Sequence, residues 1–454
     1  MIKAFGARST RIASFLGGPI RRLGGQWEGA PRFMKILLMT QYYPPEIGAA
    51  PNRLSHLARS LADSGHMVTV LTALPNYPAG KIFEEYKGRL LMEEQRDGLR
   101  IIRTWLVATK SKAFFLRILN YCSFSVLSFL AAAWKVGLQD VVIVESPPLF
   151  LGLSGFLISR LKRARFVLNV SDLWPESAVA LGIVRNARLI RIATLVEEFL
   201  YRKASLISAQ TEGIVASIRS RSRDSLIALI PNGADVFAAT KQSAELQKSV
   251  RNELGFNEHF VVGYTGLLGL AQGLETVLDS AQLLSKFPKI VIAFIGDGPD
   301  GPRLKSIAQQ SGLQNVRFVP AQPASKMPEV LSTLDIALVP LKRHPLFKGA
   351  LPSKMFAAMG AGIPIIGSVE GEARAVIAES RGGICVEPEN SLQIAEAILE
   401  LYRDPELRKS LGENGRSYVA KHFNRRDAAR KFEEFLLTSC SPHTARPDLA
   451  STGT

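Results

Sequence analysis

Cysteine is scarce in this chain of 454 residues, which contains only Cys122, Cys385 and Cys440. Three thiols cannot build a disulfide framework, and their spacing is not that of zinc ligands, so the chain is expected to fold in a reducing compartment. Aromatic residues make up only 8% of the sequence, and it contains no zinc finger or RNA-recognition motif. We therefore expect no nucleic-acid partner. No Asp-x-Asp motif follows a strand-like segment, so no metal site is expected.

Acidic residues are outnumbered by basic ones. The 56 lysines and arginines exceed the 40 aspartates and glutamates and give a formal net charge of +16. Such an excess favours an anionic partner, either a phosphorylated substrate or an anionic membrane surface.

The two ends of the chain do not have the composition of a folded domain. Residues 1–33 are rich in glycine and arginine and lack the long apolar core of a secretory signal. We interpret them as a disordered basic extension, which either precedes the true start at Met34 or contacts phosphate or lipid. Residues 439–454 are polar and contain proline, which predicts a disordered tail.

Between the ends, short apolar runs alternate with helical patterns. The run 35–39, a proline-rich loop, a helical pattern over 52–63 and a second run at 67–71 form a βαβ unit. The same alternation restarts after Asn232-Gly233 and continues to about residue 386. Nearly continuous apolar strands predict parallel sheets covered by helices on both faces. The fold class is therefore α/β, with two Rossmann-like domains at 34–225 and 226–420.

Seven short motifs, in this order, resemble family 4 glycosyltransferases of the GT-B fold, and most closely the WbuB-like, L-fucosamine-transferase-like branch that builds bacterial surface polysaccharides. The motifs are Gln41–Gly48, Ser64–Val70, Asp172-Leu173-Trp174-Pro175-Glu176, Ile230–Asp235, Tyr264–Gly269, Phe294–Pro299 and Leu351–Phe356. The resemblance implies two domains facing a central cleft, with a helix at 421–438 packing back towards the N-terminal domain. It also implies a nucleotide-sugar donor, most simply a UDP-sugar, and no other cofactor.

Glycine-rich turns and a lysine are the candidates for donor binding. Gly48 lies between the first strand and the first helix, and Gly266 and Gly269 follow the first strand of the second half, where backbone amides can bind phosphate. The alternative is that each is only a tight strand-to-helix turn. Ser353 is expected to cap the next helix, with Lys354 in its first turn. A cation there opposes the helix dipole, which makes sense if an anion binds beside it.

The resemblance also points to carboxylates, and here the sequence departs from the family. Family 4 enzymes commonly carry two glutamates with seven residues between them, and the aligned positions are Gly349 and Ala357. Glu372 lies just beyond and is the candidate replacement for a donor contact. Asp172 is the candidate catalytic carboxylate and Glu176 the second, although Asp172 also suits the cap of a helix.

An apolar segment at 113–134 is the strongest candidate for membrane contact. With Arg117 near its start it is marginal as a transmembrane span, which needs about 20 apolar residues. A second apolar segment, 147–158, precedes Arg160, Lys162, Arg163 and Arg165. Apolar helices beside basic clusters are typical of a monotopic protein on an anionic membrane, here the inner face of the plasma membrane. The alternative is two helices buried in the domain.

Together these features predict a cytoplasmic, membrane-associated retaining glycosyltransferase. It would move a sugar from a UDP-N-acetylhexosamine type of donor to a polyprenyl-pyrophosphate-linked saccharide in the synthesis of O-antigen, capsule or exopolysaccharide. The alternative, motivated by Gly349 and Ala357, is a catalytically weak GT-B protein that serves as a membrane-bound assembly partner.

Overall fold

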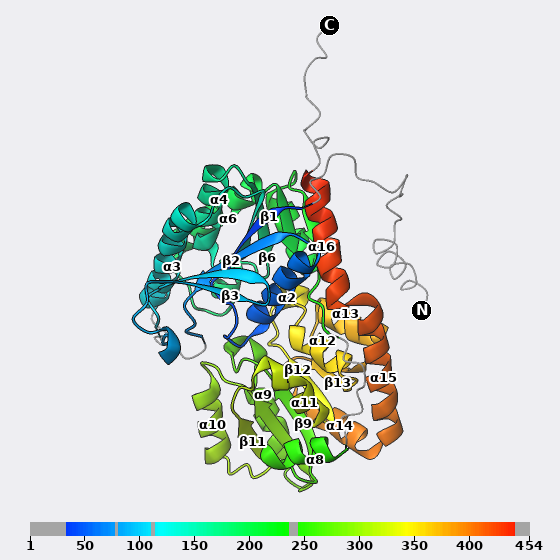
Figure 1. The fold of residues 1–454 in the computed structure, drawn as a ribbon. Helices are drawn as coiled ribbons and strands as arrows, with labels where there is room; N and C mark the ends of the chain where they lie inside the picture. The colour runs from blue at the N-terminus through cyan, green and yellow to red at the C-terminus, as the bar shows by residue number, and fades with distance from the viewer. Residues whose placement is uncertain (1–32, 78–79, 110–113, 236–243, 441–454) are drawn as a thin grey trace, which may run out of the picture.

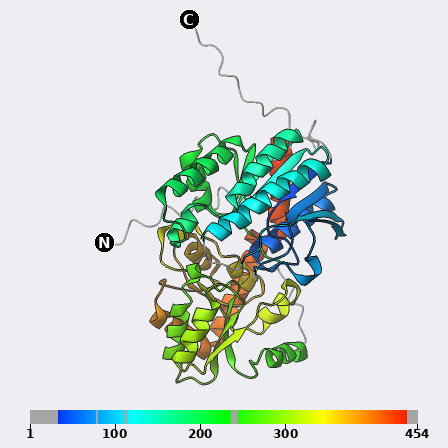
Figure 2. The ribbon, with the colours of Figure 1, turned by 90° about the vertical axis from the view of Figure 1, so that its left-hand side faces the viewer.

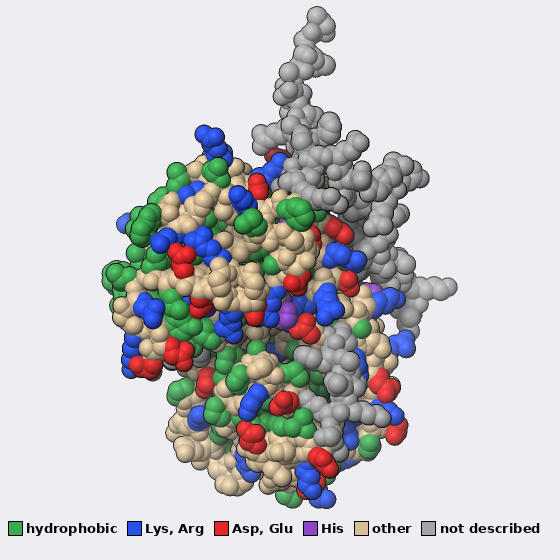
Figure 3. All heavy atoms as spheres, viewed as in Figure 1, with side chains coloured by type: hydrophobic (Ala, Val, Ile, Leu, Met, Phe, Trp, Pro, Cys, Tyr) green, Lys and Arg blue, Asp and Glu red, His purple; other side chains and the backbone are tan. Residues whose placement is uncertain are grey.

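The structure is a computed structural model that describes residues 33–77, 80–109, 114–235 and 244–440. The predictions for residues 1–32 and 441–454 lie outside the described residues. The described chain forms two α/β lobes, one above the other, joined at a narrow waist (Figures 1 and 3).

The N-terminal sheet has eight strands in the order β3-β4-β2-β1-β5-β6-β7-β8. All neighbours are parallel except β3 and β4, which pair as an antiparallel hairpin at the sheet edge. The strands are β1 Lys35–Met39, β2 Met67–Ala73, β3 Leu91–Arg96, β4 Leu99–Thr104, β5 Val141–Ser146, β6 Arg165–Val170, β7 Leu206–Ala209 and β8 Ile227–Leu229. The sequence did not predict the hairpin. Because β8 pairs with β7, the N-terminal domain ends after Leu229 and not at 225.

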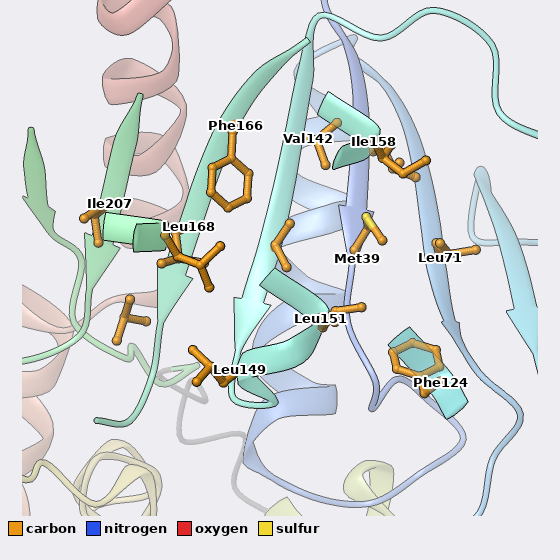
Figure 4. Close-up of a cluster of buried hydrophobic side chains, with 14 of the residues drawn as sticks. Met39, Leu71, Phe124, Val142, Leu149, Leu151, Ile158, Phe166, Leu168 and Ile207 are labelled. Atoms are coloured by element: carbon orange, nitrogen blue, oxygen red, sulfur yellow. The ribbon is translucent and has the colours of Figure 1, made fainter. Parts of the chain in front are cut away.

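Helices cover both faces of this sheet (Figures 1 and 2). One apolar layer lies under α3 Phe114–Lys135, α4 Leu149–Leu161, α6 Ala187–Lys203 and α7 Glu212–Arg221. Figure 4 shows side chains of this layer, among them Phe124 of α3, Leu151 of α4 and Leu168 of β6. The other layer lies under α2 Ala49–Asp63 and the last helix, α16 Arg425–Cys440.

The C-terminal sheet is wholly parallel, with strand order β11-β10-β9-β12-β13-β14. Its strands are β9 Phe260–Thr265, β10 Ile290–Ile295, β11 Val316–Val319, β12 Ile336–Pro340, β13 Ile365–Ser368 and β14 Gly383–Val386. Its helices are α8 Ala244–Glu253, α9 Glu275–Leu283, α10 Gly301–Gln310, α11 Met327–Ser332, α12 Ser353–Gly360, α13 Gly371–Ser380, α14 Ser391–Arg403 and α15 Pro405–His422. Two parallel-sheet α/β domains of this kind confirm the predicted GT-B architecture.

The last helix returns to the first domain. Phe432 and Leu436 of α16 are buried in the same apolar layer as Leu54 of α2. His66, at the start of β2, accepts the Met34 amide at Nδ1 (3.1 Å), and its Nε2 lies 3.2 Å from Glu433 of α16. The helix begins at 425, four residues later than predicted. It runs two residues into the segment that the sequence suggested to be disordered.

The chain crosses between the domains at two adjacent places. The Ala234 amide donates to the Phe423 carbonyl (2.9 Å), and the Arg425 amide donates to the Ala234 carbonyl (3.2 Å). Gly233 is required here because a Cβ on it would lie 2.6 Å from the Arg425 Cα. The Arg425 guanidinium also binds Asp235 at 2.7 Å. The two crossing segments therefore form one tightly packed joint.

Candidate active site

Lys354, in the first turn of α12, carries the strongest functional signal among the predicted site residues. Its Nζ is buried and has no hydrogen-bond partner among the described residues. The ammonium lies 3.6 Å from the centroid of the Tyr264 ring at the end of β9, a cation–π contact. Burial lowers the pKa of Lys354 well below its ordinary value, because the charged form has lost its water. An anion bound here would favour the protonated form of Lys354 and accept hydrogen bonds from its Nζ.

The glycine turn after β9 lies against this lysine. Gly266 has φ +119°, and a Cβ on it would lie 3.6 Å from the Lys354 Nζ. The amides of Gly266, Leu268 and Gly269 donate to carbonyls within the protein. They are therefore not the open phosphate cradle that the sequence suggested. The buried lysine, and not these three amides, is the group at this turn that has no partner among the described residues.

The helix that carries Lys354 starts one residue earlier than predicted, at Ser353. Pro352 occupies the cap position, Ser353 is the first helical residue, and no side-chain hydrogen bond caps the helix. The prediction that Ser353 caps α12 is therefore wrong. Its side chain is exposed at the start of α12, next to Lys354 in sequence. Its predicted part in donor binding stays a prediction.

The loop after β1 in the N-terminal domain is held in place by the buried Glu46, to which the sequence analysis assigned no role. Glu46 accepts the amides of Asn76 (2.9 Å) and Tyr77 (2.8 Å) at Oε1 and that of Tyr43 (3.1 Å) at Oε2. Burial nevertheless raises the pKa of Glu46 to about 7. This glutamate ties the loop after β1 to the loop after β2. Both loops come from carboxyl ends of strands, where α/β sheets bind ligands.

Gly48 caps α2 at the end of the same loop. Its backbone is extended, and a Cβ on it would make only ordinary contacts with Pro51 and Tyr77, at 3.5 and 3.9 Å. The position therefore does not need glycine for its conformation. No acidic residue lies in the first turn of α2, so this helix N-terminus is compatible with an anion. Its role in donor binding stays a prediction.

Asp172 lines a pocket of the N-terminal domain, together with Tyr42, Arg117, Tyr121 and Trp174. Its Oδ1 accepts the hydroxyl of Ser177 in α5 Glu176–Ala180. Desolvation by the pocket walls raises the pKa of Asp172, although its side chain is exposed at the mouth. A raised pKa makes a carboxylate a better proton acceptor, and the catalytic role of Asp172 stays a prediction.

Glu176 does not share this pocket. Its Oε1 pairs with Arg221 of α7 at 3.0 Å, and Arg221 also binds the buried Glu197 of α6. Glu197 in turn accepts the hydroxyl of Tyr201 at 2.6 Å. The structure thus places Glu176 in an ion-pair network that holds α5, α6 and α7 together, close enough to Asp172 for its charge to add to the raised pKa of Asp172.

Glu372 joins the two domains. From α13 it reaches across to the N-terminus of α7, where its oxygens accept the amides of Gly213 (2.6 Å) and Glu212 (3.1 Å). Burial raises the pKa of Glu372. For Glu372 to contact the donor, as predicted, its carboxylate must give up these two hydrogen bonds and bind the donor in their place.

Gly349, one of the two positions without the family glutamate, lies at the same contact. It ends the short helix η4 Pro345–Gly349, and a Cβ on it would lie 3.0 Å from the Cα of Gly213. Leu346 of the same helix packs into the apolar layer of the N-terminal domain. In this arrangement of the domains there is no space for a side chain at 349.

A second polar cluster at the carboxyl ends of β5 and β6 was also missed. Glu145 is buried and binds Arg53 of α2, Asn169 (2.6 Å) and Ser171 (2.6 Å). The available signal was a glutamate that ends a wholly apolar strand run, just before Ser146-Pro147-Pro148.

In the part of the chain that the structure describes, no group of three histidine, cysteine, aspartate or glutamate side chains is placed to hold a metal ion.

Two protein-family models match the chain. Residues 48–233 match the model described as "Glycosyl transferase 4-like domain", and residues 247–418 match "Glycosyl transferases group 1". A candidate colanic acid biosynthesis glycosyl transferase, WcaI, from Escherichia coli (strain K12) is 27% identical over 411 residues, which cover 88% of this chain and 98% of WcaI.

Solved structures agree on the fold. Sucrose-phosphate synthase from Thermosynechococcus elongatus superposes with a TM-score of 0.68 at 18% identity and covers 89% of this chain and 98% of that one. Anabaena HepE in complex with UDP-glucose superposes with a TM-score of 0.67 at 17% identity, covering 89% and 100%.

These matches define the class of protein as a GT-B glycosyltransferase. The two models together span most of the described chain, one for each domain, and the chain belongs to the family 4 glycosyltransferases.

Proposed function

We propose that this protein is a retaining glycosyltransferase that moves a sugar from a UDP-linked donor to a hydroxyl of a lipid-linked saccharide, in the synthesis of a bacterial surface polysaccharide. The main support for a diphosphate-linked donor is the buried ammonium of Lys354. It has no partner among the described residues and lies beside the glycine turn after β9. It supplies a positive charge where the diphosphate leaving group gains negative charge. The UDP-glucose complex of HepE and the name of WcaI support a nucleotide-sugar donor and a polysaccharide product.

In the proposed reaction the bond between the sugar and the diphosphate breaks. The acceptor oxygen bonds to the same carbon from the face that the diphosphate leaves, so the configuration of that carbon is retained. Lys354 stabilises the departing diphosphate. Asp172, with its raised pKa, accepts the acceptor hydroxyl as a hydrogen-bond partner and takes up its proton. The finer choice of an N-acetylhexosamine donor such as UDP-N-acetyl-L-fucosamine rests on the WbuB-like motifs alone.

We also propose that the protein lies on the inner face of the plasma membrane. One helix, Phe115–Lys135, is long and apolar enough to cross a bilayer by length and composition. However, Phe124, Ala131 and Ala132 on its inner side are buried against the sheet, which favours a peripheral position.

The outward side of the same helix layer forms an apolar face. Hydrophobic side chains gather over α3 on the flank of the upper lobe (Figure 3), and α3, α4 and α6 lie side by side in Figure 2. The apolar face comprises the exposed residues Phe115, Leu119, Val126, Leu130 and Trp134 of α3, Leu157 and Leu161 of α4, and Leu189, Ile192 and Leu195 of α6. Arg160, in the last turn of α4, and Arg163, just after it, are exposed and close in sequence to Leu161 of this face, and anionic headgroups are expected to bind there.

The alternative of a catalytically weak assembly partner is tested at Ala357. This residue lies one turn after Lys354 on α12, so the two side chains share a helix face. In an active enzyme, Ala357→Glu should strengthen UDP binding, because the new carboxylate accepts a hydrogen bond from a ribose hydroxyl in a partly desolvated site. Calorimetry with UDP and a transfer assay on a lipid-linked acceptor provide the measurement. If neither protein binds UDP while circular dichroism shows an intact fold, the assembly-partner function is the correct one.

A further inference from the structure

The Asp172 pocket lies at the carboxyl edge of the N-terminal sheet, beside the first turns of α3. Its walls come from the first turns of α3, from the segment 147–150 that leads into α4, and from residues 172–184 around α5. Each of these elements starts at the carboxyl edge of the sheet, the edge that faces the other domain. Phe115, Leu116 and Leu119, on the same turns of α3, are exposed. A ligand in this pocket would thus contact the reacting end of the site and an apolar surface at once.

Arg117 is the one basic side chain among the described residues that line the pocket. No carboxylate partner is found for it in the described chain, and its only hydrogen bond to a described residue is a long one, 3.5 Å, from Nη2 to the Tyr121 hydroxyl. Asp172, the one acidic lining residue, is instead engaged by Ser177. A half-buried guanidinium without a counter-ion is suited to bind the planar oxygens of a phosphate.

The remaining lining residues are mostly apolar or aromatic. Trp174 and Tyr42 are half-buried in the wall, and aromatic faces of this kind pack against the C–H groups of a sugar ring. Leu181, Ile183 and Val184 close the side towards α6, whose exposed Leu189 and Ile192 continue the apolar face. The pocket therefore offers sugar-packing aromatics, one cation and an apolar exit in a single cavity.

We propose that this pocket binds the phosphate-bearing end of a lipid-linked acceptor, with Arg117 on the phosphate, the sugar between Trp174 and Asp172, and the lipid chain leaving over the exposed turn at Phe115–Leu119. The inference rests on the proposed transferase function for the identity of the acceptor. It assigns to Arg117 a binding role that is independent of Lys354, because the two cations line separate sites on different domains.

The test is calorimetric titration of the full chain with farnesyl pyrophosphate, with the donor site first saturated with UDP. Farnesol and inorganic pyrophosphate are titrated alongside, because they carry only the lipid or only the phosphates. Farnesyl pyrophosphate should bind at least about tenfold more tightly than either, since it fills the cation site and the apolar exit together. Equal affinity for farnesol or for inorganic pyrophosphate would overturn the proposal.

The variant for this titration is Arg117→Met, which keeps the length of the side chain and removes the charge. Its matched control is Arg188→Met, which removes an equal charge from the exposed surface of α6 outside the pocket. Arg117→Met should weaken farnesyl pyrophosphate binding about tenfold or more, and Arg188→Met by less than about twofold. Equal losses in both variants would mean general attraction by the basic surface and would refute a specific site.

A second variant keeps the proposal testable if Arg117→Met does not fold. Leu181→Trp narrows the pocket without changing a charge and should also lower farnesyl pyrophosphate affinity, with UDP affinity unchanged. If UDP binds and farnesyl pyrophosphate binding is insensitive to both variants, the pocket proposal fails and the transferase stands. If UDP does not bind but farnesyl pyrophosphate binding depends on Arg117, the donor part of the proposed function fails and the pocket stands.

Discussion

Replacing Lys354 by methionine should change stability and donor binding in opposite directions. The substitution keeps the apolar stem over Tyr264 and removes an ammonium that has no hydrogen-bond partner among the described residues. Burying a polar group without a partner costs about 1–3 kcal/mol, so the free energy of unfolding of the unliganded variant should rise by that order. A charge-assisted contact to the diphosphate is worth about 1.5–3 kcal/mol, so UDP binding should weaken roughly 10- to 150-fold.

The stability gain should also depend on pH. Because the folded pKa of Lys354 lies below its unfolded value, the unfolded chain binds more protons between the two values, and wild-type stability rises with pH there. The advantage of Lys354→Met over wild type should therefore be largest at low pH and shrink as pH rises. Urea unfolding at several pH values and calorimetry with UDP measure the two effects.

Lys305→Met provides a matched control for this experiment. Lys305 lies over the Phe318 ring at 5.8 Å, but its side chain is exposed on α10. Neither stability nor UDP affinity should change much in this variant. If Lys354→Met leaves UDP affinity unchanged, or destabilises the free protein by as much as a cavity in the core, the assignment of Lys354 to the diphosphate is wrong.

Three further outcomes are expected. Glu372→Gln should raise hydrogen exchange at the Glu212 and Gly213 amides, and unchanged protection would mean that the contact between the domains does not depend on this carboxylate. Replacing Arg160 and Arg163 together by glutamine should release the protein from anionic vesicles, as should high salt, whereas retention after a carbonate wash would indicate a true membrane span at α3. Because the pKa of Glu46 is raised to about 7, the Glu46 carboxyl is protonated in the folded state and ionised in the unfolded state between about pH 4.5 and 7. The free energy of unfolding of the wild type should therefore fall, relative to that of Glu46→Gln, as pH rises through this window, by on the order of 1–3 kcal/mol. A flat difference between these two proteins from pH 5 to 8 would contradict the assignment.

The two sheets could be predicted from the sequence because most of their central strands are apolar runs of five to seven residues. One such run, Ile290–Ile295, is buried throughout. The sequence was insufficient for the edge hairpin β3–β4, because β3 is largely exposed and carries Glu93 and Glu94. It also missed β8, whose three residues are too few to show a period. Edge strands contribute little apolar surface, so their pattern resembles that of a loop.

The candidate site could be predicted only in part for a similar reason. Lys354 was identified because a lysine in a first helical turn is locally unfavourable, and this signal lies within a few residues. The bonds of Glu372 to Gly213 join residues 159 apart, and no local pattern indicates them. Gly349 was recognised as a missing glutamate, but the reason for the glycine is its approach to Gly213 across the domain boundary.

The return of α16 to the first domain determines how this enzyme can be recombined with its relatives. Phe432 and Leu436 complete a core whose members outside α16 lie between Met34 and Ala228, so a gene fragment cut at the end of β8 lacks part of its own interior. A chimera designed to exchange donor specificity must therefore replace an internal segment, from the Gly233 joint to Phe423, and keep both ends of the recipient chain. An end-to-end exchange of halves would separate α16 from the core that it completes, whereas exchange of the inserted segment keeps α16 on the first domain.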